Sequence, residues 1–299
     1  MKTKIAILFL LIAGISLQDV IGQITILSGP KQASYHRFVD DMANVLNTDS
    51  ETLVINKETS GAAFNYNQLF DPKSPFKVAM MQSDYLYFMQ AKDFVNNSDN
   101  SKPLKVVLPL ANEEIHLVTL KSFNINRLQD LDSMTVAIGT KDQGTYATAN
   151  LIKDRSQVYW KSRNVHFVDA VKELSMNRVH AFFIVGTAPI EKLEINPQVM
   201  RAEPVMVELQ NFNGWADNYI NDTIYAQDYP WLDHDVPTFS VRTVLLVNEA
   251  KMTEADKKAL NEIMNGILNK YDILKAQGHP KWKEVDFGAW SDSDWPMYK

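Results

Sequence analysis

The chain has 299 residues, of which 45% are hydrophobic and 22% charged, with no cysteine and a formal net charge of −6 at pH 7. This length predicts two domains or one large one, and the composition suits packed cores rather than disorder. The acidic balance argues against nucleic-acid binding, which needs a basic surface. The lack of cysteine excludes disulfides, thiolate nucleophiles and thiolate metal sites.

The N-terminus has the pattern of a secretory signal peptide. Lys2 and Lys4 precede the apolar stretch Ile5–Leu17, and the small residue Gly22 offers a cleavage position. We predict a signal peptide over residues 1–22 and a soluble mature chain, with an uncleaved anchor as the alternative. Because an exported chain without cysteines is less typical of eukaryotes, the predicted compartment is a bacterial periplasm.

Strands and helices alternate through the first part of the chain. Apolar runs predict strands, and apolar residues at helical spacing follow each run. The strands are 24–28, 52–56 and 78–81, and the helices are 35–46, 62–70 and 85–94, the last capped by Ser83 or Asp84.

The middle part continues this alternation. Two extended segments, 104–110 and 115–120, are interrupted by the polar residues 111–114. The strands that follow are 134–139, 165–168 and 181–185, with helices at 145–154 and 169–174. Alternating elements predict an α/β fold with mostly parallel sheets, covered by helices on both faces.

The last part is less regular. Residues 212–235 have no clean period, residues 238–247 predict a long strand, and Thr253–Tyr271 predicts an amphipathic helix capped by Thr253 and Asp256. The tail contains Trp282, Trp290 and Trp295, whose rings are expected to pack against the body of the protein.

Strand–loop–helix junctions carry candidate binding residues, and the three clearest lead from 24–28 into 29–35, from 78–81 into 82–85 and from 134–139 into 140–149. Such junctions direct free backbone N–H groups and the positive end of a helix dipole outward, which favours an anion. The residues in question are Thr59, Ser60, Gly61, Gln82, Ser83, Asp84, Gln143, Gly144, Thr145 and Tyr146. Plain helix caps would explain several of them equally well.

Charged and aromatic side chains supply further candidates for ligand binding. Lys31 could pair with an anionic ligand, Arg242 could hold a carboxylate, and Asp84 could hold an amine. Solvent exposure for Lys31 and an ion pair between domains for Arg242 are the alternatives. Tyr35, Tyr146 and Tyr229 could line a cleft or belong to the core.

Enzyme signatures are scarce. The chain lacks Gly-x-Ser-x-Gly, His-Glu-x-x-His and phosphate-loop motifs. The clusters 113–116 and 233–235 place carboxylates beside a histidine without helical i, i+4 spacing, so we expect no metal site and no cofactor. A pair of catalytic carboxylates for glycosidic cleavage stays an alternative, because the two members of such a pair are usually distant in sequence and leave no local motif.

Several motifs in order resemble one family of receptors. They include Leu27-Ser28-Gly29 before Ser34-Tyr35, the Gln82-Ser83-Asp84 triplet, Gly144-Thr145-Tyr146, Gly186-Thr187-Ala188-Pro189, and Asp235-Val236-Pro237-Thr238. From about Ile24 to Leu268 the chain resembles the TAXI branch of substrate-binding receptors of tripartite ATP-independent periplasmic (TRAP) transporters. It departs from the family's pattern at Pro30, Lys31 and Gln32, where more glycine is usual, and at His180.

This resemblance implies the type II periplasmic-binding-protein fold, in which two α/β lobes are joined by a hinge of two crossing strands. Lobe one would comprise residues 23–110 plus 238–299, and lobe two residues 111–237. A small anionic or zwitterionic ligand, such as glutamate or a dicarboxylate, would be clamped between Ser34, Tyr35, Ser60 and Gln82 on one side and Gly144, Thr145, Tyr146 and Thr187 on the other.

The resemblance also implies a TRAP permease as partner of a monomeric, non-enzymatic receptor. Two alternatives remain at this point: an exported hydrolase that uses separated carboxylates, and a sensor-associated binding protein of the same fold.

Overall fold

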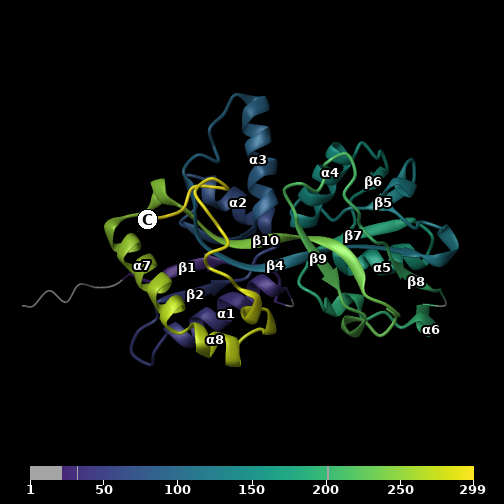
Figure 1. Ribbon diagram of the computed structural model, residues 1–299. Coiled ribbons are helices and arrows are strands. Elements are labelled where there is room, and N and C mark those ends of the chain that lie inside the picture. The colour runs from purple at the N-terminus through teal and green to yellow at the C-terminus, as the bar shows by residue number, and fades with distance from the viewer. Residues whose placement is uncertain (1–21, 32, 201) are drawn as a thin grey trace, which may run out of the picture.

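The computed structural model describes residues 22–31, 33–200 and 202–299, so the predicted signal peptide lies outside the described residues except for Gly22. Figure 1 shows two halves side by side, with the long strands β4 (Leu104–Leu120) and β10 (Val236–Asn248) running across both.

The first half is a three-layered unit. Its strands β1 (Ile24–Leu27), β2 (Val54–Lys57) and β3 (Val78–Gln82) are parallel in the order β2-β1-β3. The helices between them are α1 (Ser34–Leu46), α2 (Ala62–Phe70) and α3 (Ser83–Asn96). Alternate strand residues enter opposite cores, because successive side chains of a strand point to opposite faces: Val78 and Met80 join one core, Ala79 and Met81 the other.

The second half repeats this plan. Its strands β5 (Thr135–Ala137), β6 (Lys161–Arg163) and β7 (Ala181–Gly186) are parallel, and α4 (Gly144–Ser156) and α5 (Phe167–Ser175) connect them. The shorter elements are β8 (Pro204–Met206), β9 (Ile220–Ile224) and α6 (Pro197–Met200).

The long strands join the two halves into one sheet. Its order is β2-β1-β3-β10-β4-β7-β5-β6, and both β4 and β10 run antiparallel to their neighbours. The sheet is therefore mixed rather than mostly parallel. The predicted interruption at residues 111–114 is wrong, since β4 continues through Asn112, Glu113 and Glu114, each paired with β10.

The C-terminal segment completes the first half. Helices α7 (Glu254–Asn269) and α8 (Tyr271–Gln277) pack with α1 on one face of the sheet, while α2 and α3 cover the other (Figure 1). The predicted capping box at Thr253 and Asp256 is confirmed, although α7 ends at Asn269. In the tail, Trp282 and Trp295 are buried, as predicted for rings packed against the body, and Trp290 is half-buried.

Two local predictions are wrong. Residues 165–168 form no strand: the strand is β6, and His166 caps α5, where its ring nitrogen accepts a hydrogen bond from the Val168 N–H. The N-cap of α3 is Gln82 rather than Ser83 or Asp84, both of which lie inside the first turn. Among the described residues no helix is long and apolar enough to cross a bilayer.

Candidate functional site

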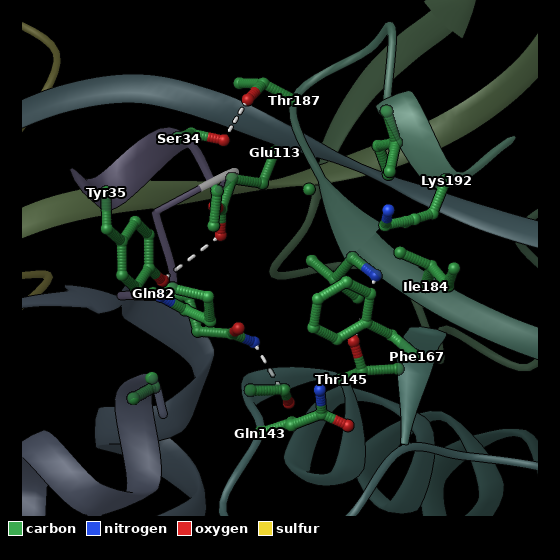
Figure 2. Close-up of a pocket in the computed structure, with 18 of the residues that line it drawn as sticks. Ser34, Tyr35, Gln82, Glu113, Gln143, Thr145, Phe167, Ile184, Thr187 and Lys192 are labelled. Atoms are coloured by element: carbon green, nitrogen blue, oxygen red, sulfur yellow. Dashed lines mark hydrogen bonds between the residues drawn. The ribbon is translucent and has the colours of Figure 1, made fainter. Parts of the chain in front are cut away.

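A cavity of about 170 Å³ lies between the two halves. Figure 2 shows residues of both halves around it, with Tyr35, Gln82 and Glu113 facing Phe167, Ile184 and Lys192. Its volume is below the ~300–1,000 Å³ of sites for drug-sized ligands, so it suits a small metabolite.

Four helices start at this cavity. The lining includes Ser34 at the start of α1, Gly61 before α2, Gly144 at the start of α4 and Phe167 at the start of α5. Because helix N-termini carry free N–H groups and a partial positive charge, their convergence makes this region favourable for an anion.

The structure brings nine of the sixteen predicted site residues to the lining. They are Ser34, Tyr35, Ser60, Gly61, Gln82, Gln143, Gly144, Thr145 and Thr187. Their contact with a ligand stays a prediction. Two already have a local role: the Gln143 side-chain oxygen accepts from the Thr140 N–H at 2.9 Å, and the Thr145 hydroxyl oxygen accepts from the Val185 N–H at 3.1 Å. The Thr145 hydroxyl proton remains available to a ligand.

Side chains of the two halves also bond directly to each other. The hydroxyls of Ser34 and Thr187 form a hydrogen bond across the cavity (Figure 2). Gln82 Nε2 of the first half donates to Thr148 Oγ1 at 2.6 Å and to the Gly144 carbonyl at 3.3 Å in the second half. These bonds hold the two halves together in the described conformation.

Asp84 belongs to the contact between the halves and does not line the cavity. Its carboxylate accepts from Gln82 Nε2 at 2.6 Å, Thr148 Oγ1 at 2.7 Å and Tyr219 Oη at 3.2 Å. The side chain is buried. The structure therefore does not favour its predicted role in binding the amine of a ligand, because the carboxylate already accepts hydrogen bonds from three donors.

The other predicted residues outside the lining have identifiable surroundings. Thr59 Oγ1 donates to the Ser28 carbonyl and shapes the turn before α2, and the Tyr229 hydroxyl bonds to His116 Nε2 at 2.8 Å inside the core. The rest are Lys31, exposed; Ser83, buried at the start of α3; Tyr146, packed edge-on against Phe88; and Arg242, half-buried near Asp286 and Asp294.

Six lining residues with chemical character were not among the sequence-based candidates, and one of them is the exposed acid Glu191. Glu113 lies on β4, Arg37 on α1, Phe167 on α5, Lys192 in the 3₁₀ turn Glu191–Leu193, and His279 precedes the turn Pro280–Glu284. The polar pair Glu113-Glu114 inside an apolar strand was the available signal, but it was interpreted as a loop. Nothing local marked Lys192 or His279.

Glu113 is an acid in an environment that disfavours its charge. Its side chain is only 4% exposed, and Oε2 accepts from Tyr35 Oη at 3.2 Å. Burial, followed by the nearby acids Asp84 and Glu114, raises the pKa of Glu113 to about 8, although the hydrogen bond from Tyr35 acts in the opposite direction. The carboxyl is thus mostly neutral at pH 7 in the ligand-free protein.

Glu114, by contrast, has partners on both oxygens. Oε1 pairs with Lys281 Nζ at 2.5 Å and Oε2 accepts from the Ala188 N–H at 2.8 Å. This buried ion pair connects β4 to the C-terminal tail.

His279, two residues before Lys281, also lines the cavity. Burial, together with the nearby cations Arg37 and Lys281, lowers the pKa of His279 to about 4, so its ring is neutral at pH 7.

The raised pKa of Glu113 predicts a pH effect on stability. Between pH 4.5 and about 8 the folded protein keeps a proton that the unfolded chain releases. The free energy of unfolding should therefore fall as pH rises, by up to about 1.4 kcal/mol per pH unit. Urea unfolding of the ligand-free protein at pH 5 to 8 should show this slope relative to Glu113→Gln. The exposed control Glu194→Gln should keep the wild-type slope, and identical slopes for all three proteins would contradict the prediction.

A sequence profile described as the NMT1-like family matches residues 26–291. The chain belongs to the NMT1-like family. A search of curated proteins gives no match to it. Among the described residues of this NMT1-like chain, no group of three His, Asp or Glu side chains is arranged to hold a metal ion.

Solved structures share the fold at low sequence identity. MatC from Rhodopseudomonas palustris, with bound malate, is 14% identical with a TM-score of 0.52, covering 85% of this chain and 86% of MatC. Tv2483 bound to L-arginine is 11% identical, with a TM-score of 0.51 and coverage of 89% and 91%. A structure concerning glutathione import through GshT and the cystine ABC importer of Streptococcus mutans is 8% identical, with a TM-score of 0.51 and coverage of 91% and 100%.

These similarities confirm the predicted fold class. The NMT1-like chain has the mixed α/β fold of two-lobed periplasmic binding proteins, with β4 and β10 as the strands that cross between the lobes. Two of the proteins that share this fold were solved with a small molecule bound, malate in one and L-arginine in the other. The TAXI assignment is a narrower prediction, as are its permease and its ligand.

Proposed function

We propose that the chain is a periplasmic receptor of the TAXI type, which binds a small carboxylate or amino acid and delivers it to a TRAP permease. One observation carries this proposal: residues of both lobes, at the starts of four helices, line a single small cavity. A ligand that touches both lobes stabilises the closed state, and a permease can recognise that state.

The division of the chain into lobes belongs to this proposal. We propose that residues 23–110 plus 238–299 form lobe one and 111–237 lobe two, in a monomer exported by the signal peptide. The hydrophobic clusters change close to these boundaries, between Ala111 and Ile115 along β4 and between Val241 and Val244 along β10, so Ala111 packs with lobe one and Val241 with lobe two.

A thermal-shift screen with glutamate, glutamine, succinate and 2-oxoglutarate tests the proposal. A ligand at 100 times its Kd adds about 2.7 kcal/mol to the free energy of unfolding, which is readily seen as a higher Tm. Thr145→Val, which removes a hydroxyl at the start of α4, should weaken binding about five- to tenfold. Thr52→Val, at an exposed position outside the lining, should not. If no small acid at millimolar concentration raised Tm, the proposal would fail.

Other measurements distinguish a transport receptor from the two alternatives, a hydrolase and a sensor-associated binding protein. An exported hydrolase would consume its substrate, so an unchanged ligand concentration after prolonged incubation favours a receptor. A sensor-associated binding protein would show the same ligand binding. A permease gene beside the gene for this chain would favour transport.

A further inference from the structure

Glu113 is a buried acid that faces the cavity without a cationic partner. Only its Oε2 has a hydrogen-bond partner among residues 22–31, 33–200 and 202–299, namely Tyr35. Oε1 has none there, although the side chain lines the cavity. Since a buried carboxyl group is costly to leave unpaired, this oxygen is available to a ligand.

The other acids near Glu113 are already satisfied. Asp84 accepts three hydrogen bonds in the contact between the lobes, and Glu114 is paired with Lys281 and the Ala188 N–H. Both acids raise the pKa of Glu113 through their charge. A ligand cation at this wall of the cavity would offset the repulsion between these acids and the ionised form of Glu113.

Two cations lie elsewhere on the lining, together with one exposed acid, Glu191. Figure 2 shows the Lys192 ammonium group across the cavity from Glu113 and Tyr35. Arg37 also lines the cavity, and within the described part of the chain neither cation has an acidic partner in an ion pair. Together with the starts of α1, α2, α4 and α5, these cations favour a negative group on the ligand.

We propose that Glu113 selects a small zwitterion, by binding the ligand's protonated amine while Lys192, Arg37 and the helix starts bind its acid group. This inference rests on the proposed receptor function and narrows its ligand class to small acids that carry an amine. Glu113 is then the specificity-determining residue, in place of Asp84.

If Glu113 binds the ligand's amine, the direction in which ligand affinity changes with pH is determined. A ligand ammonium needs the ionised form of Glu113, so affinity for an amino acid should rise between pH 6 and 8, by up to about tenfold per pH unit. A neutral Glu113 that donated a hydrogen bond to a ligand carboxylate would give the opposite slope. The charged or titratable groups around Glu113 and the cavity are Tyr35, Arg37, Asp84, Glu114, Glu191, Lys192, His279 and Lys281.

Isothermal titration with matched ligand pairs tests this inference. The pairs are L-glutamate with glutarate and L-aspartate with succinate, measured at pH 6, 7 and 8. In the wild type the amine-bearing member should bind at least tenfold more tightly, and increasingly so at higher pH. Glu113→Gln should remove most of this preference and its pH slope, whereas Glu194→Gln should keep both.

A second variant keeps the test decisive if Glu113→Gln fails to fold. Tyr35→Phe retains the acid but removes the hydrogen bond that favours its ionised form, so the rise in affinity should move to higher pH. Equal affinity within each pair, or an amine preference unchanged in Glu113→Gln, would overturn the inference and leave the receptor function intact. Failure of all four acids to bind would overturn both.

Discussion

Replacing Trp282 with alanine is expected to lower the free energy of unfolding by about 3–5 kcal/mol, the usual cost of deleting a buried aromatic side chain. The Trp282 ring is fully buried, and its centroid lies 4.7 Å from that of Phe38 on α1. Its Nε1–H donates to Asp41 Oδ2 at 2.8 Å. Urea unfolding monitored by circular dichroism measures the loss.

Two further variants test how much of the stability lost in Trp282→Ala comes from packing of the buried ring. Trp282→Phe keeps a ring but loses the hydrogen bond to Asp41, so we expect a smaller cost of about 1–3 kcal/mol. Phe94→Ala removes a ring that is 88% exposed and should change the free energy by less than about 0.5 kcal/mol. A small loss for Trp282→Ala would show that the tail does not support the first lobe.

Gly144→Ala should disrupt the contact between the lobes at the start of α4. A Cβ at this position would lie 1.7 Å from Gln82 Oε1 and 2.5 Å from its Cδ. Gln82 cannot move away freely, because its Nε2 is bonded to Asp84 and Thr148. We expect a loss of about 1–3 kcal/mol in stability and at least a tenfold loss in ligand affinity, measured by unfolding and titration.

The sign of this effect is informative, because alanine is otherwise the better helix former by about 1 kcal/mol. Gly288→Ala is the matched control, since its nearest neighbour is the Asp286 side chain at 3.3 Å, and it should change little. The double variant Gly144→Ala with Gln82→Ala should recover stability relative to Gly144→Ala, because it removes the clash. A neutral Gly144→Ala would contradict the close approach of the lobes.

The elements that the sequence predicted well have local signals. The helix α2 has the predicted bounds, and the capping box of α7 combines Thr253 with Asp256 three residues later. Such patterns act within a few residues, so tertiary contacts are not needed to interpret them.

The interpretation of β4 failed for a physical reason. Polar residues in a strand usually indicate a loop or an exposed edge, whereas Glu113 and Glu114 are buried by contacts with α1, the 187–189 loop and the tail. Those partners are between about 70 and 170 residues away in the chain, so no local pattern contains them. A conflict between local preference and fold often marks a functional position, and here it coincides with the acid in the cavity.

The candidate site was predictable only where strand–loop–helix junctions form it. Gly61, Gln82 and Gly144 lie at such junctions and do line the cavity. Lys192 and His279 come from a 3₁₀ turn and from the tail, and only the folded chain brings them there. Whether these residues bind a ligand stays a prediction.

The distance in sequence between β1 and the segments that complete its lobe, β10 and the tail, has a consequence for biosynthesis. Both hydrophobic clusters of the first lobe include residues of β10, and each also includes a tryptophan of the tail, Trp282 in one and Trp295 in the other. A ribosome that has made only the first hundred residues has therefore produced β1 and β3 without the partners that close their cores. Folding of this lobe must therefore wait until β10 and the tryptophans of the tail have been synthesised, and until then its apolar strand residues stay within reach of chaperones.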